Sequence, residues 1–227
     1  MTIYDTSGWW DGDARWLRIL QNMVPARFSL FEPIMGSWRD KVGLDLGCGG
    51  GFMSMALWER GAKVSAIDLS APAIFAAQRH ARMAGAQIDF RVGDGRQLPY
   101  AESSFDFVIC VDVFEHTTDV ASVISEIHRV LRPRGTLLFD TINRTSIARM
   151  VMVTLGEEIC GFVPRGSHDP ALFLSPRQLL KYLREGSFDV GRISGFGPRG
   201  IDRRGDVTFG RLPTTAIQYA GHAVCVK

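Results

Sequence analysis

The sequence predicts an α/β fold in which a mostly parallel sheet is covered by helices on both faces. Two observations lead to this prediction. Short apolar segments typical of buried strands alternate five times with segments of helical periodicity over residues 42–142. A glycine-rich turn, "GCGGG" at residues 47–51, directly follows the first apolar segment. Open parallel sheets bind ligands at such turns, where the strands end.

Each element of this alternation has a local signal. Residues 13–35 carry apolar side chains on a helical period without a glycine, which predicts the first helix. Helices are also predicted over residues 51–60, 71–84 and 117–131; Ser70 caps the second of these, Pro72 lies in its first turn and Gly85 ends it. Between them the apolar segments predict five strands: Val42–Leu46, Lys63–Asp68, Gln87–Val92, Phe105–Cys110 and Gly135–Ile142. The stretch "RPRG" before the last of these predicts a turn.

The alternation ends after Ile142. The remaining sequence predicts an apolar helix at 146–155, a loop "VPRGSHDP", a helix at 176–185, a strand at 188–195, an Arg- and Gly-rich loop, and a last strand at 216–226. We expect a single domain over residues 1–227, with a helical cap (1–40), a ligand-binding core (41–142), a lid insertion (143–174), and a final part (175–227) that contains a helix and the last strands.

Composition places the chain among ordinary globular proteins. Hydrophobic residues make up 46% and charged residues 22%, which is typical of a soluble domain. No signal peptide or bilayer-spanning run is recognisable, and the four cysteines lack any framework spacing, so free thiols and a cytoplasmic location are expected. Residues 141–227 carry 12 Lys and Arg against 7 Asp and Glu. This basic part is interpreted as a solvated face, with an anionic surface or substrate as the alternative.

The glycine turn and three acidic residues predict the ligand. Gly47 and Gly49 fit a dinucleotide fingerprint, but Phe52 stands where its third glycine belongs. Asp45 precedes the turn and could face a cationic group, Asp68 ends the second strand where an acid accepts ribose hydroxyls, and Asp94 follows the third strand and could accept from an exocyclic amine. Ammonium, ribose diol and adenine amine are the polar ends of S-adenosylmethionine, which carries no phosphate.

Several motifs agree with this ligand. "LDLGCGGG", "AIDLS", "GDGRQLPY", "FDFVIC" and "LRPRG" resemble, in order and spacing, the motifs of class I methyltransferases over about residues 40–142. The resemblance implies a Rossmann-like sheet of seven strands, in an order near 3-2-1-4-5-7-6 with an antiparallel last strand. It also implies S-adenosylmethionine as cofactor, with Leu69 and Gly95 of these motifs among its contacts.

A narrower resemblance covers nearly the whole chain. "SGWWD", "DVFEH", "TINRT", "VPRGSHD" and "LSPRQLLKYL" resemble the ubiquinone-biosynthesis O-methyltransferases, which methylate hydroxyls on polyprenylated rings. The resemblance implies O-methylation of a phenolic, catechol or quinol-like small molecule. Carried over by motif, Arg27, Gly47, Asp68 and Val111 are expected to contact the cofactor.

The same family has been assigned a divalent metal at an acidic-x-x-Glu-His motif. Here the matching residues are Asp112, Glu115 and His116, with Asp in place of the usual Glu. A magnesium, manganese or zinc ion at this place would lower a phenol's pKa and hold its oxygen in line. The alternative is that Glu115 and His116 shape the acceptor pocket, or that His116 acts directly as the base.

Further candidates surround the acceptor. His168, in "RGSHDP", could take the acceptor's proton, or it could only stabilise a turn. Trp9 and Trp10 could form an aromatic wall over the site, anchor the chain at a membrane interface, or pack the N-terminal helix onto the sheet. Asp140 and Asn143 are expected at the rim where the acceptor enters. The lid helix near Arg144 and Arg149 could also touch a membrane surface through residues 144–158.

Three other functions stay open. The first is a secondary-metabolite O- or N-methyltransferase with a compact, non-prenylated substrate. A nucleic-acid methyltransferase is suggested only by the basic final part and lacks an "NPPY"-type motif, so we expect no nucleic-acid partner. A non-catalytic cofactor-binding protein is the third. The sequence leaves the oligomeric state open.

Overall fold

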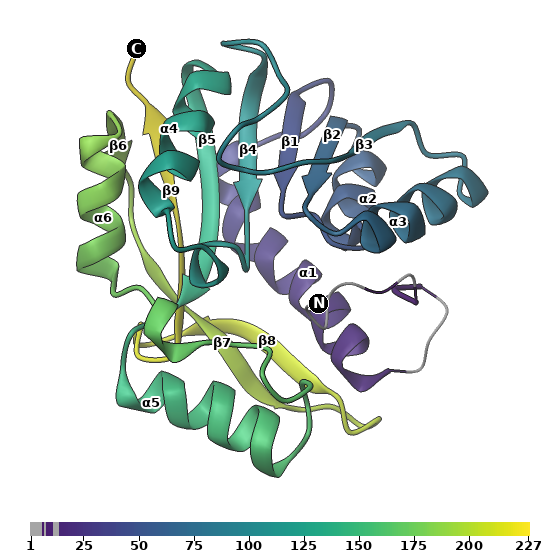
Figure 1. The fold of residues 1–227 in the computed structure, drawn as a ribbon, viewed down its shortest axis with the longest axis vertical. Helices are drawn as coiled ribbons and strands as arrows, with labels where there is room; N and C mark the ends of the chain where they lie inside the picture. The colour runs from purple at the N-terminus through teal and green to yellow at the C-terminus, as the bar shows by residue number, and fades with distance from the viewer. Residues whose placement is uncertain (1–5, 7, 11–13) are drawn as a thin grey trace.

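One sheet forms the centre of the molecule (Figure 1). The computed structural model describes residues 6, 8–10 and 14–227, and within these residues the sheet has nine strands. They are β1 (Val42–Leu46), β2 (Lys63–Asp68), β3 (Ile88–Val92), β4 (Phe105–Cys110), β5 (Leu131–Ile142), β6 (Phe188–Val190), β7 (Ser194–Ile201), β8 (Val207–Leu212) and β9 (Gln218–Cys225). Their order is β3-β2-β1-β4-β5-β9-β7-β8, with β6 also paired to β9.

The first five strands are parallel and the rest are antiparallel. The connecting segments form the helices α1 (Arg15–Met35), α2 (Phe52–Glu59), α3 (Ala71–Met83), α4 (Val120–Val130), α5 (Ser146–Arg149) and α6 (Pro176–Glu185), the short 3₁₀ helices η1 (Phe114–His116) and η3 (Pro170–Leu172), and the π-helix η2 (Met150–Ile159). This arrangement confirms the predicted α/β class with its antiparallel last strand beside the fifth.

Helices cover both faces of the sheet because its central strands are apolar on both sides. On β4, Val108 and Cys110 pack with residues of α4 and α6, whereas Phe107 and Ile109 pack with residues of α1 and α2. Ala66 of β2 packs with α3 on the second of these faces. The parallel strands end at one common edge of the sheet, and the turns that follow them there can carry a site.

Side-chain caps begin several helices, among them the predicted cap at Ser70. The Ser70 hydroxyl accepts a hydrogen bond from the backbone N–H of Ala73, and Ser175 forms a reciprocal capping box with Gln178 at the start of α6. Each cap satisfies a backbone donor that the first helical turn leaves open.

The sheet is larger than the predicted seven strands. The predicted Arg- and Gly-rich loop is in fact a hairpin of β7 and β8, which extends the sheet beyond β9. Its glycines give no alternating apolar pattern, so the hairpin depends on pairing with β9. The predicted turn at "RPRG" is a bulge inside β5, where the register with β4 shifts and Arg134 takes a φ of 61°.

Other segments also differ from the prediction, and the predicted strand at 188–195 is divided between β6 and β7. The predicted helix at 146–155 continues to Ile159 as η2. The predicted start of the first helix at residue 13, and part of the "SGWWD" motif, lie outside the described residues. The four cysteines are unpaired, and no helix of the described chain is long and apolar enough to cross a bilayer.

Candidate active site

The glycine turn after β1 has an unusual backbone. Gly47, Gly49 and Gly51 all have positive φ, at 75°, 51° and 86°. The backbone N–H of Gly47 donates to the carbonyl of Ile67 at 2.8 Å, which holds the turn against the end of β2. Residues with a β-carbon rarely adopt this backbone, so the conformation explains why the turn is built from glycine.

Trp9 packs against this turn. A β-carbon placed on Gly49 would be 2.5 Å from Cη2 of Trp9, and the Trp9 side chain is 5% exposed. Trp10 donates from Nε1 to the carbonyl of Gly50 at 2.7 Å, and its ring stacks on His80 at a centroid distance of 3.5 Å. The tryptophan pair therefore packs the segment before α1 against the turn and α3, which is a packing role, although against the turn rather than the sheet.

Asp68 connects the turn to the next helix. One carboxylate oxygen accepts from the backbone N–H of Gly49 and the other from the N–H of Ser70, each at 2.8 Å. Burial raises the pKa of this carboxyl, and the two backbone donors partly offset the rise. Asp68 therefore fixes the shape of the turn while it stands at the end of β2.

Asp45 is buried inside β1, at 1% exposure. Its Oδ2 accepts from the Ser54 hydroxyl at 2.5 Å, whereas Oδ1 has no hydrogen-bond partner among the described residues. Burial raises its pKa to about 6, although the bond from Ser54 opposes the rise. A buried acceptor without a partner costs free energy, so this oxygen suits a donor supplied by a water or a ligand at the turn.

The other predicted residues along β2 and β3 are more open. Leu69 is 71% exposed directly after β2. Asp94 and Arg96 pair at 2.6 Å, and this hydrogen bond lowers the pKa of the Asp94 carboxyl. A ligand amine at Asp94 would therefore compete with Arg96. Gly95 packs closely on Leu46, which leaves little room for a side chain at that position.

Arg27 and two carboxylates join α1 to the ends of β4 and β5. The buried guanidinium bonds Asp140 through Nε at 2.6 Å and also pairs with Asp112. Although burial alone lowers the Arg27 pKa, the two carboxylates raise it above its usual value. Asp140 is fully buried and also accepts from the backbone N–H of Asp112 at 3.0 Å. The predicted place of Asp140 at an open rim is therefore wrong. Val111, buried beside it, packs in the core shared with α1.

The three candidate metal ligands do not face a common point. Asp112 is paired with Arg27, and Glu115 accepts from the Thr141 hydroxyl at 2.7 Å in the core. Among the described residues, no group of three or more His, Cys, Asp and Glu side chains is arranged to hold a metal ion. The donor set in "DVFEH" therefore does not fit a divalent ion in this structure.

Glu115 and His116 are neutral near pH 7. Burial, with a smaller contribution from Asp112, raises the pKa of Glu115 to about 8. Desolvation by the surrounding protein, with a second contribution from His168, lowers the pKa of His116 to about 4. A histidine with such a pKa is a weak proton acceptor, which makes His116 a poor general base.

Glu115→Gln should flatten the dependence of stability on pH. The folded carboxyl keeps its proton up to about pH 8, whereas the unfolded one loses it near pH 4.5. Its contribution to the free energy of unfolding is therefore full below pH 4.5 and is lost as the pH rises toward 8. The free energy of unfolding, measured by urea denaturation, should decrease less from pH 5 to pH 8 in the variant than in the wild type. Equal decreases in the two proteins would contradict the shifted pKa.

His168 lies beside His116, their ring centroids 5.5 Å apart. Nδ1 of His168 bonds Oε1 of Glu157 at 2.7 Å, whereas its Nε2 bonds none of the described residues. Glu157 is buried in η2, a segment whose apolar pattern gives no sign of a functional acid. Sequence reasoning therefore found His168 and missed its partner, because the two meet only through the fold of the intervening loop.

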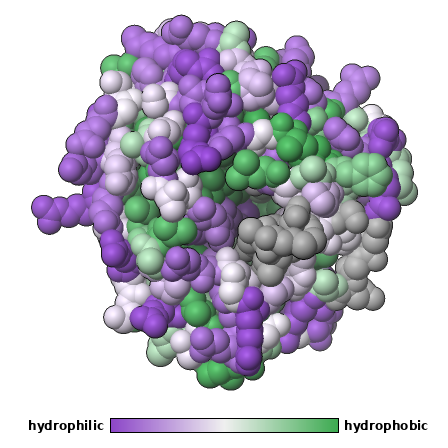
Figure 2. All heavy atoms as spheres, viewed as in Figure 1, coloured by the Kyte–Doolittle hydropathy of each residue, from purple (hydrophilic) through white to green (hydrophobic). Residues whose placement is uncertain are grey.

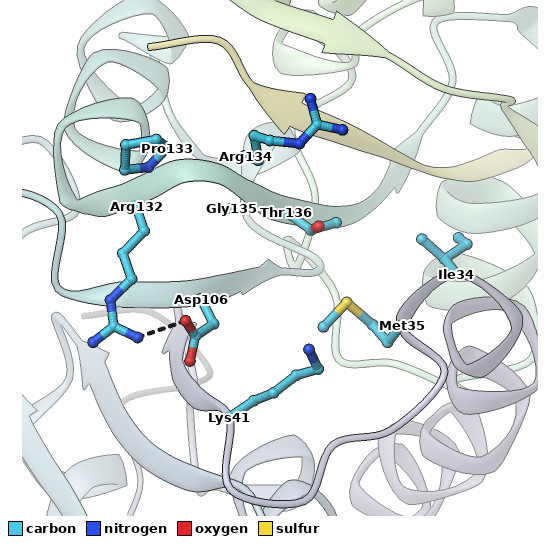
Figure 3. Close-up of a pocket in the computed structure, with 9 residues that line it drawn as sticks. All are labelled: Ile34, Met35, Lys41, Asp106, Arg132, Pro133, Arg134, Gly135 and Thr136. Carbon is cyan, nitrogen blue, oxygen red and sulfur yellow. Dashed lines mark hydrogen bonds and ion pairs between the residues drawn. The ribbon is translucent and has the colours of Figure 1, made fainter.

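The cavities lie on different sides of the molecule. One of about 310 Å³, shown in Figure 3, is lined by Lys41, Asp106 and Arg132–Thr136 at the start of β4 and β5, so it is at the edge opposite the predicted site. Another of about 500 Å³ lies between the start of α1 and the end of η2, with Glu157 at its border. Figure 2 shows the face viewed in Figure 1, which is hollowed near its centre, with apolar side chains beside the hollow.

A family model and individual relatives both identify similar proteins as methyltransferases. A family model described as "Methyltransferase domain" matches residues 44–139. The chain is 33% identical over 190 residues to a protein of Methylococcus capsulatus named ubiquinone biosynthesis O-methyltransferase, covering 83% of this chain and 79% of that one. A protein of the same name from an Azoarcus species is 33% identical over 216 residues, covering 95% and 90% of the two chains.

Solved structures share the fold. A methyltransferase of Methanosarcina mazei, described as SAM-dependent, matches with a TM-score of 0.65 at 21% identity, over 86% of this chain and 97% of that chain. Magnesium protoporphyrin IX methyltransferase from Synechocystis PCC 6803, solved with bound SAH, matches with a TM-score of 0.66 at 22% identity, over 92% and 85%. At these identities the likeness concerns the fold alone.

Proposed function

The chain belongs to the family of the ubiquinone biosynthesis O-methyltransferases, S-adenosylmethionine-dependent enzymes, and from this premise we propose that it methylates a hydroxyl of a phenolic, catechol or quinol-like small molecule. The observation that supports a hydroxyl acceptor is the imidazole of His168, held through Nδ1 by Glu157. A phenol needs to lose its proton as its oxygen is methylated, and an imidazole with an available nitrogen suits that task.

The cofactor site is proposed at the ends of β1, β2 and β3. The unpartnered Oδ1 of Asp45 supports a ligand there, because a bound group can satisfy that acceptor directly or through water. S-adenosylmethionine supplies an electrophilic methyl group on a sulfonium. The residues proposed to hold it are Arg27, Asp45, Gly47, Gly49, Asp68, Leu69, Asp94, Gly95 and Val111.

His168 is proposed as the general base and His116 as a wall of the acceptor pocket. His116 is a weak base because its pKa is only about 4. The His116 ring stacks on the ring of His168. Asp112 is proposed to act on Arg27 rather than on the acceptor, because the two side chains form an ion pair. The main contribution to rate then comes from holding the acceptor in line, with proton removal added to it.

Turnover with a panel of acceptors tests this proposal. Purified protein with S-adenosylmethionine should form S-adenosylhomocysteine in the presence of catechols and quinols, with the methyl group on oxygen in the product. A matched set of aryl amines tests the alternative of N-methylation, and a prenylated and a compact catechol separate the two substrate classes. Transfer to amines but to none of the phenols would overturn the proposal.

The same assay tests whether turnover requires a metal ion. The residues of "DVFEH" do not fit an ion, so we propose that turnover is unchanged after dialysis against a chelator. Loss of turnover that magnesium, manganese or zinc restores would show instead that these side chains rearrange around an ion.

Residues 143–174 are proposed to cover the acceptor, and residues 144–158 to contact a membrane peripherally. Arg144 and Arg149 are exposed in this region. Four of its large apolar side chains are also 40–68% exposed: Ile147, Met150, Leu155 and Ile159. Such a surface suits an anionic lipid interface. Cosedimentation should occur with vesicles that contain phosphatidylglycerol and should decrease in the double variant Ile147→Ser and Met150→Ser. Equal sedimentation of both proteins would refute the contact.

A further inference from the structure

Glu157 is a buried acid on η2, a helix whose other side chains are mostly apolar. It is 3% exposed, whereas the next residue, Glu158, faces solvent. Burying a carboxylate is costly unless hydrogen bonds replace its water. The fold retains this acid where an apolar residue would be easier to bury, so its bonding partners indicate its role.

Three N–H groups of one loop bond this carboxylate. The backbone N–H of Gly166 donates to Oε2 at 2.7 Å, and the backbone N–H of His168 donates to Oε1 at 3.1 Å. The third partner is Nδ1 of the His168 ring, at 2.7 Å from Oε1. Two bonds therefore hold the loop, and only the third acts on the side chain of His168.

The third bond determines which ring nitrogen carries hydrogen. A carboxylate accepts and cannot donate, so the hydrogen of a neutral His168 ring lies on Nδ1 and the lone pair on Nε2. The neighbouring ring of His116, at an interplanar angle of 23°, limits rotation on one side. Nε2 bonds none of the described residues and is not sealed from solvent. The ring is thus set with its basic nitrogen available.

We infer that Glu157 is a positioning residue, which fixes the His168 ring in the tautomer and orientation that receive the acceptor's proton. The inference rests on the proposed function, since it assumes an acceptor hydroxyl. In that step the O–H bond breaks, its electron pair stays on the oxygen, and the proton binds Nε2 of His168. Because Glu157 belongs to η2, the covering segment itself supplies the group that prepares the base.

Nuclear magnetic resonance tests the positioning without any substrate. In protein labelled with ¹⁵N-histidine, the His168 signals should report hydrogen on Nδ1 in the wild type. Glu157→Gln should change this pattern, and Glu158→Gln, which alters the neighbouring exposed acid, should keep it. A His168 signal unchanged by Glu157→Gln would overturn the inference, even if the protein proves to be an active O-methyltransferase.

A double-mutant cycle tests the effect on rate. Glu157→Gln should lower kcat about 10-fold or more, with little change in the KM for S-adenosylmethionine. His168→Asn should lower kcat further than Glu157→Gln does. Adding Glu157→Gln to His168→Asn should then change kcat less than about twofold, because the acid acts through the ring. An equal loss in both backgrounds would make Glu157 a loop-holding residue only and refute the inference. Absence of wild-type turnover on every phenol would refute the proposed function, while the resonance result still decides the positioning.

Discussion

Arg27→Met is expected to destabilise the folded protein by about 3–5 kcal/mol. The substitution keeps most of the side-chain volume but leaves the buried Asp140 and its neighbour Asp112 without their cation. Two uncompensated carboxylates at the ends of β4 and β5 cost far more than the loss of an exposed pair. Chemical denaturation monitored by circular dichroism measures the change.

Lys181→Met provides the control for this prediction. Lys181 pairs with Glu185 on the exposed surface of α6 at 3.8 Å, and such a pair contributes less than about 1 kcal/mol. Adding Asp140→Asn to Arg27→Met should recover part of the lost stability, because it removes the fully buried charge of the pair, whereas Asp112 is partly exposed. If Arg27→Met costs no more than Lys181→Met, the buried network does not hold α1 to the sheet.

Gly49→Val is expected to weaken S-adenosylmethionine binding by about 100-fold or more. The β-carbon would lie 2.5 Å from Cη2 of Trp9, and a β-branched residue at φ 51° adds backbone strain of about 1–3 kcal/mol. To relieve both, the turn has to move and lose the bond from the Gly49 N–H to Asp68. Calorimetric titration with the cofactor measures the loss.

Gly85→Val is the control that separates the effect of backbone strain from that of the steric contact with Trp9. Gly85 also has a positive φ, 69°, but nothing lies within 4 Å of its β-carbon position. This variant should lose stability and keep its cofactor affinity. Trp9→Ala combined with Gly49→Val should restore part of the binding. Near wild-type affinity of Gly49→Val would show that the shape of the turn does not matter for the ligand.

The elements with strong local signals were predictable from the sequence. β2, β4 and α6 begin and end where expected, since apolar segments and the Ser175 capping box are contained within a few residues. The β7–β8 hairpin was not, because its glycines and Pro198 form strands only by pairing with β9. Its stability comes from contacts that no local pattern shows.

The candidate site also has features that the sequence could predict and features that it could not. The residues at the ends of β1 and β2 could be found because a parallel sheet brings strand ends together whatever the side chains are. The partners of those residues could not be found. Pairing of Asp112 with Arg27 and of Glu157 with His168 joins segments 85 and 11 residues apart. These pairings changed the interpretation of Asp112 from a metal ligand to a member of a buried ion-pair network.

Calorimetric titration of S-adenosylmethionine into the wild type and Asp68→Ala tests the central claim, that the ends of β1 and β2 form the cofactor site. We expect the wild type to bind one equivalent, and Asp68→Ala to bind about 10- to 100-fold more weakly, from the loss of about 1.5–3 kcal/mol of hydrogen bonding. Asp89→Ala, which removes an exposed acid of β3, should bind like the wild type. Absence of binding by the wild type, or equal affinity of a folded Asp68→Ala protein, would contradict the claim.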